Sequence, residues 1–273
     1  MTEIHLNAAE GRARLETRAG ALVPRVIHTG PASARVALVA GGALLLGGDR
    51  VRLDVTVGAG CTLELEDIGG TVAYNADGHK SEWIVDVTVE AGALLIWHGL
   101  PFVVADGANV DRRTSIILRG PGATACLRET IVLGRTGERG GIIDLRTSVL
   151  TIATTSDEKN QTEPLFVERL VVRGTEPVPG VIGTNRVMDS LLYFGGRAPA
   201  VAPAVLGATE ILELEGPATI ARSLQHEAHR SVLTTVWDDW CASALAVQAA
   251  GLVTDSAADL PEPHTPEREP AVR

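Results

Sequence analysis

Cysteine and aromatic residues are scarce in this sequence. Cys61, Cys126 and Cys241 are odd in number, lie far apart and never form a CxxC pair, and aromatics make up only 3% of the chain. A disulfide framework or a structural zinc site shows paired or closely spaced cysteines, so we expect these three to be small buried residues. Because aromatics are so few, the core must be built from Val, Leu, Ile and Ala.

Positive charge is also in deficit. The chain has 24 Lys and Arg against 34 Asp and Glu, a formal charge of −10 at pH 7. A negative surface repels phosphate backbones, which argues against a nucleic-acid partner. No apolar run is long enough to span a membrane, and residues 1–5 lack the basic-then-apolar layout of a signal peptide. These absences predict a cytoplasmic protein with no membrane partner.

Turn formers and β-branched residues, by contrast, are abundant. The chain contains 29 Gly and 14 Pro, and residues 51–57 alternate between apolar and polar side chains. Alternation with a period of two is typical of a strand that buries one face. Gly47 and Gly48 precede this strand and let the backbone turn just before the carboxylate of Asp49. We therefore predict a mainly β fold of many short strands.

A repeat organises the middle of the chain. Residues 54–63 return as residues 86–95, and a looser copy occupies residues 115–123. Each copy is a strand, a turn containing Gly and another strand, and copies are spaced by roughly 30 residues. One such unit cannot bury its apolar face alone, whereas stacked copies cover one another's open edges. The repeat predicts layered β structure, either solenoid-like or sandwich-like.

Three further strands are predicted outside the repeat. Residues 34–39 form the first strand, after a stretch of mixed charges, and residues 145–152 and 165–172 form two later ones. The polar segment 154–161 between the later two is predicted to be an exposed loop.

One helix is predicted near the C-terminus. Apolar residues from Val232 to Leu245 recur at i, i+3, i+4 and i+7, and Ser231 can cap the first turn. The apolar face would pack on the protein's own β core or on a partner. We assign residues 1–254 to a single β-rich domain and expect residues 255–273 to be a disordered tail.

Motifs of enzyme chemistry are missing from the sequence. It has no GxSxG elbow, and no Gly-rich loop leads into a helix to hold phosphate. His226 and His229 form an i, i+3 pair that lacks the HExxH spacing of a zinc site, so a polar helix start explains them better.

What remains is a set of carboxylates in apolar surroundings. Asp49, Glu129 and Glu168 lie beside or within strand patterns. Ionised groups are seldom buried without a partner or an aqueous cavity. One interpretation is internal salt bridges, for which Arg128, Arg135 and Arg169 are available. The other is a wet interior passage that holds a cation briefly, because sparse carboxylates bind a metal too weakly to store it.

Several short motifs, each weak alone, follow one another between residues 35 and 175. They are Gly47-Gly48-Asp49-Arg50, Val55-Thr56-Val57-Gly58-Ala59-Gly60, Tyr74, Ala93-Leu94-Leu95-Ile96-Trp97, Asp106-Gly107-Ala108, Leu133-Gly134-Arg135, Gly137-Glu138 and Glu163-Pro164-Leu165-Phe166-Val167-Glu168. In this order and spacing they resemble the UreD family of urease accessory proteins, called UreH in some organisms, and the C-terminal third resembles it only loosely.

Two motifs depart from the family pattern. An acidic residue is missing after Trp97-His98-Gly99-Leu100-Pro101, where His98 is a candidate substitute. No aromatic residue follows Gly137-Glu138.

The resemblance implies a mostly β fold with a couple of helices and a role without catalysis. Members of this family bind apo-urease and recruit UreF, which docks the nickel-carrying GTPase UreG. Ni²⁺ would then travel through the protein transiently, with no stably bound cofactor and no tight metal site. Carried over by motif, the residues of this nickel passage are Asp49, Thr71, Glu129 and Glu168.

Two alternatives remain open. A β-rich enzyme or a carbohydrate- or small-molecule-binding protein of solenoid or cupin type would need clustered carboxylates, such as Asp49 and Glu168 within about 5.5 Å in an open cleft. A purely structural binding module would have all of its carboxylates paired in salt bridges.

Overall fold

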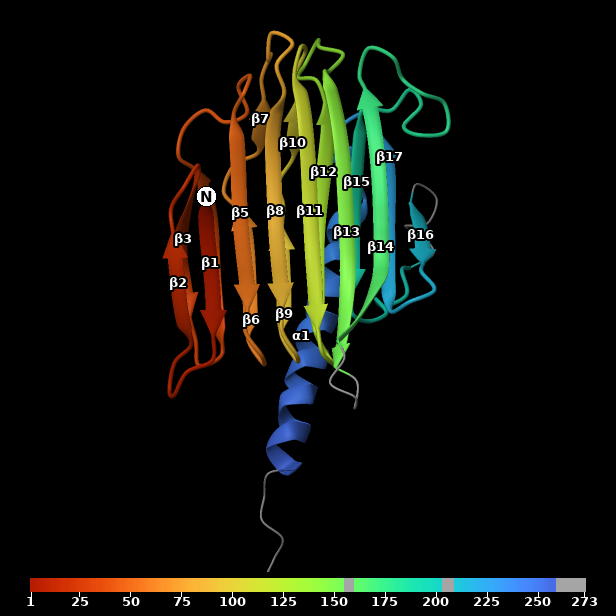
Figure 1. The fold of residues 1–273 in the computed structure, drawn as a ribbon. Coiled ribbons are helices and arrows are strands. Elements are labelled where there is room, and N and C mark those ends of the chain that lie inside the picture. Colours follow the sequence, from red (N-terminus) through yellow and green to blue (C-terminus); the bar gives the residue numbers. More distant parts are fainter. Residues whose placement is uncertain (155–159, 203–208, 259–273) are drawn as a thin grey trace, which may run out of the picture.

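The computed structural model describes residues 1–154, 160–202 and 209–258. These residues form β-strands and one long C-terminal α-helix (Figure 1). The strands are β1 (Thr2–Asn7), β2 (Arg14–Arg18), β3 (Leu22–Thr29), β4 (Ser33–Ala40), β5 (Arg50–Val57), β6 (Thr62–Asp67), β7 (Thr71–Ala73), β8 (Ser81–Val89), β9 (Leu94–His98), β10 (Phe102–Val104), β11 (Asn109–Arg119), β12 (Thr124–Leu133), β13 (Ile142–Thr154), β14 (Asn160–Arg173), β15 (Val187–Phe194), β16 (Glu210–Glu213) and β17 (Ala218–Gln225).

Within the described residues the strands build two sheets that face each other. Sheet A has seven strands in the order β14-β13-β11-β8-β5-β1-β2. Sheet B has ten: eight follow the order β16-β17-β15-β12-β9-β6-β4-β3, and the short β10 pairs with β12 and β7. From β5 to β13 the longer strands alternate between the sheets and stack in parallel, so the architecture is a solenoid-like stack. The prediction of a mainly β, layered fold is confirmed.

The sequence repeat corresponds to successive layers of this stack. Asp54 on β5 pairs with Asp86 on β8, and Asp86 pairs with Ser115 on β11, so equivalent repeat positions stand side by side. The turns that carry the chain from sheet A to sheet B also stack. The Gly60 N–H donates to the Ala91 carbonyl (3.0 Å), one layer along. The repeat therefore sets the register of both sheets.

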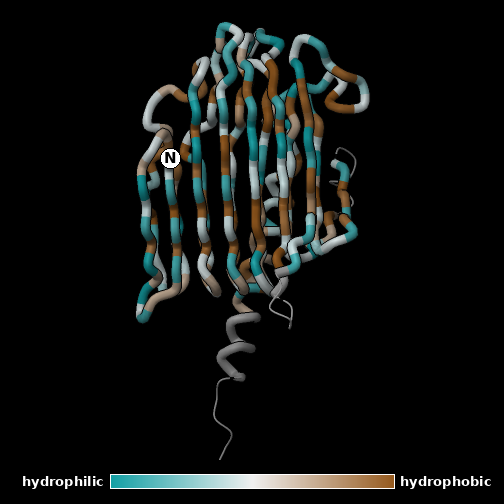
Figure 2. Tube along the Cα trace, viewed as in Figure 1, coloured by the Kyte–Doolittle hydropathy of each residue, from teal (hydrophilic) through white to brown (hydrophobic). Residues whose placement is uncertain are grey.

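The main hydrophobic core lies between the two sheets. Alternate side chains of each strand point inward, as on β5, where Val51, Leu53, Val55 and Val57 are at most 2% exposed. Figure 2 shows hydrophobic and hydrophilic positions alternating along the strands. Cys61 and Cys126 are fully buried, as predicted, whereas Cys241 is only partly buried; all three are free thiols.

Helix α1 (Leu233–Ala258) covers part of the outer face of sheet B. Trp237 and Trp240 pack against Leu94 and Ile96 of β9 and their neighbours, forming a second hydrophobic cluster. The Ser231 hydroxyl accepts the Leu233 N–H (3.2 Å), the predicted cap. The apolar face of the helix therefore packs on the protein's own sheet, while its C-terminal half extends past the end of the sheets (Figure 1).

The strand predicted to come first is not the first strand of the chain. Strands β1, β2 and β3 precede the predicted first strand, which corresponds to β4. On the edge strand β2, exposed charges such as Arg14 and Arg18 mask the alternation, whereas the inner strand β1 does alternate but is only six residues long. The backbone of α1 runs to Ala258, past the predicted boundary at 254, and residues 259–273 lie outside the described part.

Strands β13 and β14 match the two later predicted strands. The outer residues of the predicted loop between them belong to these strands, and residues 155–159 lie outside the described part. No helix in the described ranges has the length and apolar character needed to cross a bilayer.

Candidate functional site

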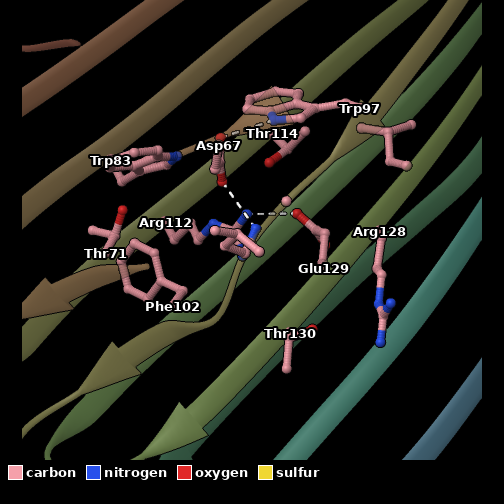
Figure 3. Close-up of a pocket in the computed structure, with 13 residues that line it drawn as sticks. Asp67, Thr71, Trp83, Trp97, Phe102, Arg112, Thr114, Arg128, Glu129 and Thr130 are labelled. Atoms are coloured by element: carbon pink, nitrogen blue, oxygen red, sulfur yellow. Dashed lines mark hydrogen bonds and ion pairs between the residues drawn. The ribbon is translucent and has the colours of Figure 1, made fainter. Parts of the chain in front are cut away.

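A small polar pocket lies between the two sheets. Its cavity measures about 20 Å³, room for roughly one water molecule. Strands of both sheets contribute to it, including the short strands β7 and β10 of sheet B through Thr71 and Phe102, two residues that Figure 3 labels. The residues that line it and matter below are Asp67, Thr71, Trp83, Arg112, Thr114 and Glu129.

An ion pair crosses this pocket from one sheet to the other. Arg112 occupies an inward position of β11 between the buried Val110 and Thr114, and Glu129 points inward from β12. Arg112 Nη2 lies 2.7 Å from Glu129 Oε1, and each side chain is 11% exposed. Burial of either charge alone would be costly, so the two neutralise each other.

Asp67 is a second carboxylate in the same pocket. It accepts hydrogen bonds from Trp97 Nε1 (3.2 Å) and from the Leu100 N–H (3.1 Å). Burial raises the pKa of Asp67, while these two donors and the charge of Arg112 act in the opposite direction. Figure 3 shows the Arg112 guanidinium between Asp67 and Glu129.

Two of the four predicted passage residues meet in this pocket. Thr71 lies on β7 and lines the cavity with Glu129, although the two are far apart in sequence. Asp49 and Glu168 do not line it.

Asp49 closes the turn that precedes β5. Its Oδ2 accepts the Leu46 N–H (2.9 Å). Gly48 has φ of +87°, which favours glycine, and a Cβ at Gly47 would stand 2.6 Å from the Ala76 carbonyl oxygen. Both predicted glycines are therefore required by the local backbone, and Asp49 stabilises the conformation that they permit.

Glu168 forms a second ion pair between the sheets. Arg222 on β17 donates Nη1 and Nη2 to the two oxygens of Glu168 on β14 (2.7 and 2.9 Å). Arg222 Nε also donates to Ser190 Oγ (3.0 Å). Asp49 and Glu168 thus have separate partners, unlike the carboxylate pair that the glycosidase-like alternative needs.

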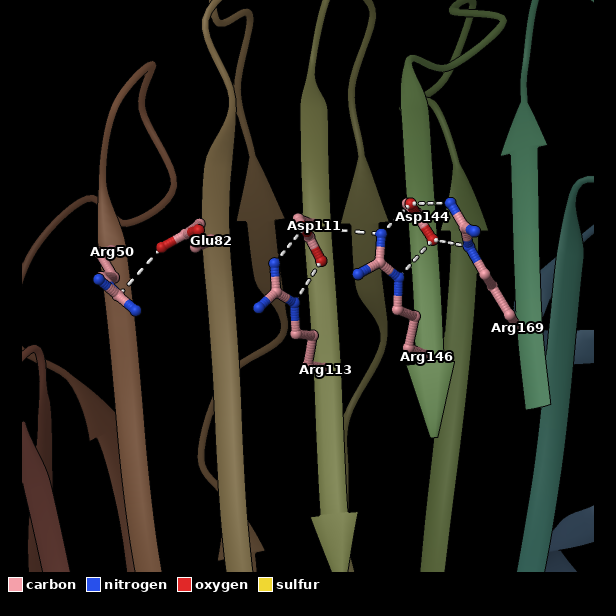
Figure 4. A network of polar contacts seen from close by, with 7 residues as sticks. All are labelled: Arg50, Glu82, Asp111, Arg113, Asp144, Arg146 and Arg169. Carbon is pink, nitrogen blue, oxygen red and sulfur yellow. Dashed lines mark hydrogen bonds and ion pairs between the residues drawn. The ribbon is translucent and has the colours of Figure 1, made fainter. Parts of the chain in front are cut away.

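The arginine partners predicted for these carboxylates were wrong. Arg128 pairs with the buried Asp189 (2.9 Å), Arg135 pairs with Glu138, and Arg169 shares Asp144 with Arg146 on the outer face of sheet A (Figure 4). The two neighbouring guanidinium groups lower the pKa of Asp144. Sequence proximity suggested these arginines, whereas the true partners lie across the core.

Four of the family-motif residues, Asp106, Gly134, Arg135 and Glu138, belong to one interlocked turn region. Glu138 Oε2 accepts the backbone N–H groups of Arg135 (2.9 Å) and Asp106 (3.2 Å). Asp106 Oδ1 in turn accepts the Gly140 N–H (2.7 Å). Gly134 has φ of +71° and starts this turn. These residues fix the loops at one end of the stack.

The histidines singled out by sequence are not grouped. His98 stacks on Trp237 (ring centroids 5.5 Å apart), and burial lowers its pKa. His229 and Arg230 both contact Glu227 in an exposed turn. Among the described residues, no three His, Cys, Asp or Glu side chains are arranged to hold a metal ion.

Sequence analysis missed Asp67 and Arg112. A usable signal was present for Arg112, since it takes an inward position in the alternating strand β11, where a charge needs a buried partner. Asp67 ends β6 just before a turn and looks like an ordinary turn residue.

The fold and the site together define a class of protein: a β-scaffold built from two stacked sheets, with a polar pocket and ion pairs between them. Comparison with known proteins identifies the family within this class. Residues 2–255 match the family described as UreD urease accessory protein.

Three relatives illustrate the match. Urease accessory protein UreD 1 of Streptomyces griseus is 39% identical over 211 residues, covering 76% of each chain. UreD 2 of Saccharopolyspora erythraea is 32% identical, covering 73% of this chain and 71% of its own. UreD 3 of Streptomyces griseus is 30% identical, covering 82% of this chain and 96% of its own.

The chain belongs to the UreD family of urease accessory proteins. This membership supports a role in urease maturation, and the family is one of accessory proteins rather than enzymes.

Proposed function

We propose that this chain acts in the cytoplasm as a non-enzymatic scaffold between apo-urease and the UreF–UreG complex. It assists the insertion of nickel, and Ni²⁺ moves through its interior without lodging there. The observation that carries the proposal is the family match over residues 2–255, which the relatives named UreD support.

The interior pocket supports the passage part of the proposal. Glu129 and Thr71 offer oxygen ligands between the sheets, in a cavity of about 20 Å³. Carboxylate and hydroxyl oxygens bind divalent ions, and few of them together bind weakly. Glu168 and Asp49 would extend the passage beyond this pocket.

The same ion pairs favour a second interpretation. Arg112–Glu129 and Arg222–Glu168 each join sheet A to sheet B, so both glutamates have a structural partner. In this case the carboxylates hold the stack together and nickel follows another route. The two interpretations differ in what removal of the Glu129 charge does to nickel loading.

The test is co-expression with urease subunits, UreF and UreG, followed by purification of the complexes and of urease. UreF and apo-urease should co-purify with this chain and not with an unrelated control protein. In Glu129→Gln, we expect unchanged UreF binding and a severalfold loss of nickel per urease active site. Glu138→Gln, outside the pocket, is the matched control and should load normally.

The outcomes separate the two parts of the proposal. Full nickel loading by folded Glu129→Gln would contradict the passage and leave the scaffold intact. Failure of UreF and urease to co-purify with the wild-type chain would contradict the scaffold itself.

A further inference from the structure

Arg112 is held less firmly than a structural arginine normally is. It makes one hydrogen bond to Glu129, while its Nε and Nη1 are buried with no acceptor among the described residues. Arg222, the other arginine that joins the sheets, donates Nε, Nη1 and Nη2 to Ser190 and Glu168. A buried donor without an acceptor costs free energy. The Arg112 guanidinium therefore loses less than the Arg222 guanidinium would when it moves out of its position.

Other polar groups around the cavity also lack partners. Thr114 Oγ1 and Trp83 Nε1 have no hydrogen-bond partner among the described residues, and these residues are 3% and 6% exposed. Both line the cavity of about 20 Å³ beside Asp67 and Arg112 (Figure 3). Buried polar groups of this kind normally meet a water or a ligand. The cavity is therefore built to hold something polar and small.

The two carboxylates are placed on either side of the guanidinium. Asp67 is held by Trp97 and Leu100 and has no ion pair with Arg112 within the described residues, so its position does not depend on the guanidinium. Glu129 is paired with Arg112 and lines the same pocket from β12, so its carboxylate still faces the cavity when the guanidinium moves. Without Arg112 they would form a doubly negative site beside the hydroxyl groups of Thr71 and Thr114. Such a set of oxygens suits a divalent cation.

We propose that Arg112 is a displaceable counter-ion. Its guanidinium occupies the position between Asp67 and Glu129 that a divalent cation takes when it enters the pocket, and Asp67 is the second carboxylate ligand. The proposal rests on the proposed function only in taking Ni²⁺ as the cation. Because the guanidinium competes with the metal, the site binds it weakly and releases it again.

Phe102 provides the guanidinium with a partner that does not depend on the carboxylates. Arg112 Cζ lies 5.2 Å from the centre of the Phe102 ring. This cation–π contact attracts the guanidinium to the ring face. Arg112 can therefore break its ion pair with Glu129 when a metal ion binds that carboxylate and still keep its contact with the Phe102 ring.

The experiment measures Ni²⁺ binding to the purified full chain by equilibrium dialysis. Arg112→Met removes the competing charge, so it should bind Ni²⁺ about tenfold more tightly than the wild type, or about 1.4 kcal/mol. Arg112→Lys keeps the charge and should stay within about threefold of the wild type, or about 0.6 kcal/mol. Adding Asp67→Asn to Arg112→Met should abolish the gain. Folded Arg112→Met that binds no more tightly than the wild type would overturn the proposal.

A second measurement covers the case in which Arg112→Met does not fold. Trp83 and Trp97 line the pocket, so Ni²⁺ bound there should quench tryptophan fluorescence in the wild type. Asp67→Asn should lose the saturable part of the quenching. Equal quenching in both proteins would contradict the assigned site.

Nickel loading of urease distinguishes this proposal from the passage itself. If Glu129→Gln reduces loading but Arg112→Met gains no affinity, the passage stands and the counter-ion role fails. If Arg112→Met gains affinity through Asp67 while Glu129→Gln loads urease normally, the cation site stands and the passage fails.

Discussion

Asp189 ties helix α1 to sheet B, and its substitution should loosen the helix selectively. The carboxylate is fully buried and accepts hydrogen bonds from Arg128 (3.3 and 2.9 Å), Thr130 (2.8 Å) and Ser231 (2.5 Å). Ser231 caps α1, and Arg128 also reaches Thr234 in its first turn (3.3 Å). The network therefore joins β12, β15 and the start of the helix.

In Asp189→Asn the side-chain shape is kept, but one acceptor oxygen becomes an NH₂ group. At least two of the donors lose their acceptor, and hydrogen bonds to a charged group contribute about 1.5–3 kcal/mol each. The Arg128 side chain, 12% exposed, is left as an unpaired charge, a loss that typically costs about 3–5 kcal/mol. The first estimate gives about 3–6 kcal/mol for two donors and the second about 3–5 kcal/mol, a large part of the roughly 5–15 kcal/mol stability of a domain.

Two measurements check this prediction. Urea unfolding followed by circular dichroism gives the change in the free energy of unfolding, and hydrogen exchange shows where protection is lost. Ser231→Ala is the comparison variant: it removes the cap and one hydrogen bond to Asp189 but leaves Arg128 paired, so it should cost only about 0.5–2 kcal/mol. A loss below about 1 kcal/mol in Asp189→Asn, or unchanged exchange at the start of α1, would show that Asp189 does not hold the helix.

Two further predictions concern the ends of the stack and the helix. Arg135 and backbone donors lower the pKa of Glu138 to about 2 from 4.5, so the stabilisation from its carboxylate is present above about pH 4.5 and is lost as pH falls toward 2. Urea unfolding at about pH 7, 5 and 3 should therefore show a stability difference between wild type and Glu138→Gln that shrinks only at the lowest pH. A difference that grows at the lowest pH would contradict this prediction. Trp240, 1% exposed, packs edge-on to Tyr193 and donates to a backbone carbonyl. Trp240→Ala should cost about 3–5 kcal/mol in the same assay, whereas Val247→Ala on the exposed side of the helix should change stability by about 0.5 kcal/mol at most.

Local patterns were sufficient to predict the layered part of the fold. The alternation in residues 51–57 and the repeat that begins at residue 54 depend on neighbours in sequence, and they became strands β5, β8 and β11 in register. The edge strands β2 and β3 were missed because their charges obscure the alternation, whereas β1 lies inside sheet A and does alternate, but over only six residues. Local sequence therefore sets the layers, and the edges depend on tertiary context.

The site was only partly predictable for the same reason. Glu129 and Glu168 stood out as carboxylates within strands, but their partners Arg112 and Arg222 come from the opposite sheet. Which arginine faces which carboxylate depends on how the two sheets are stacked. Asp67 carries no sequence signal of its own, because only the assembled pocket buries it.

The proposed function requires this chain for loading urease with nickel. The nickel content of urease tests this requirement, when the enzyme is purified from cells that express urease, UreF and UreG with or without this chain, with nickel supplied equally. We expect urease that is largely nickel-free and inactive without the chain, and loaded and active with it. Equal nickel content in both preparations would contradict the proposed function.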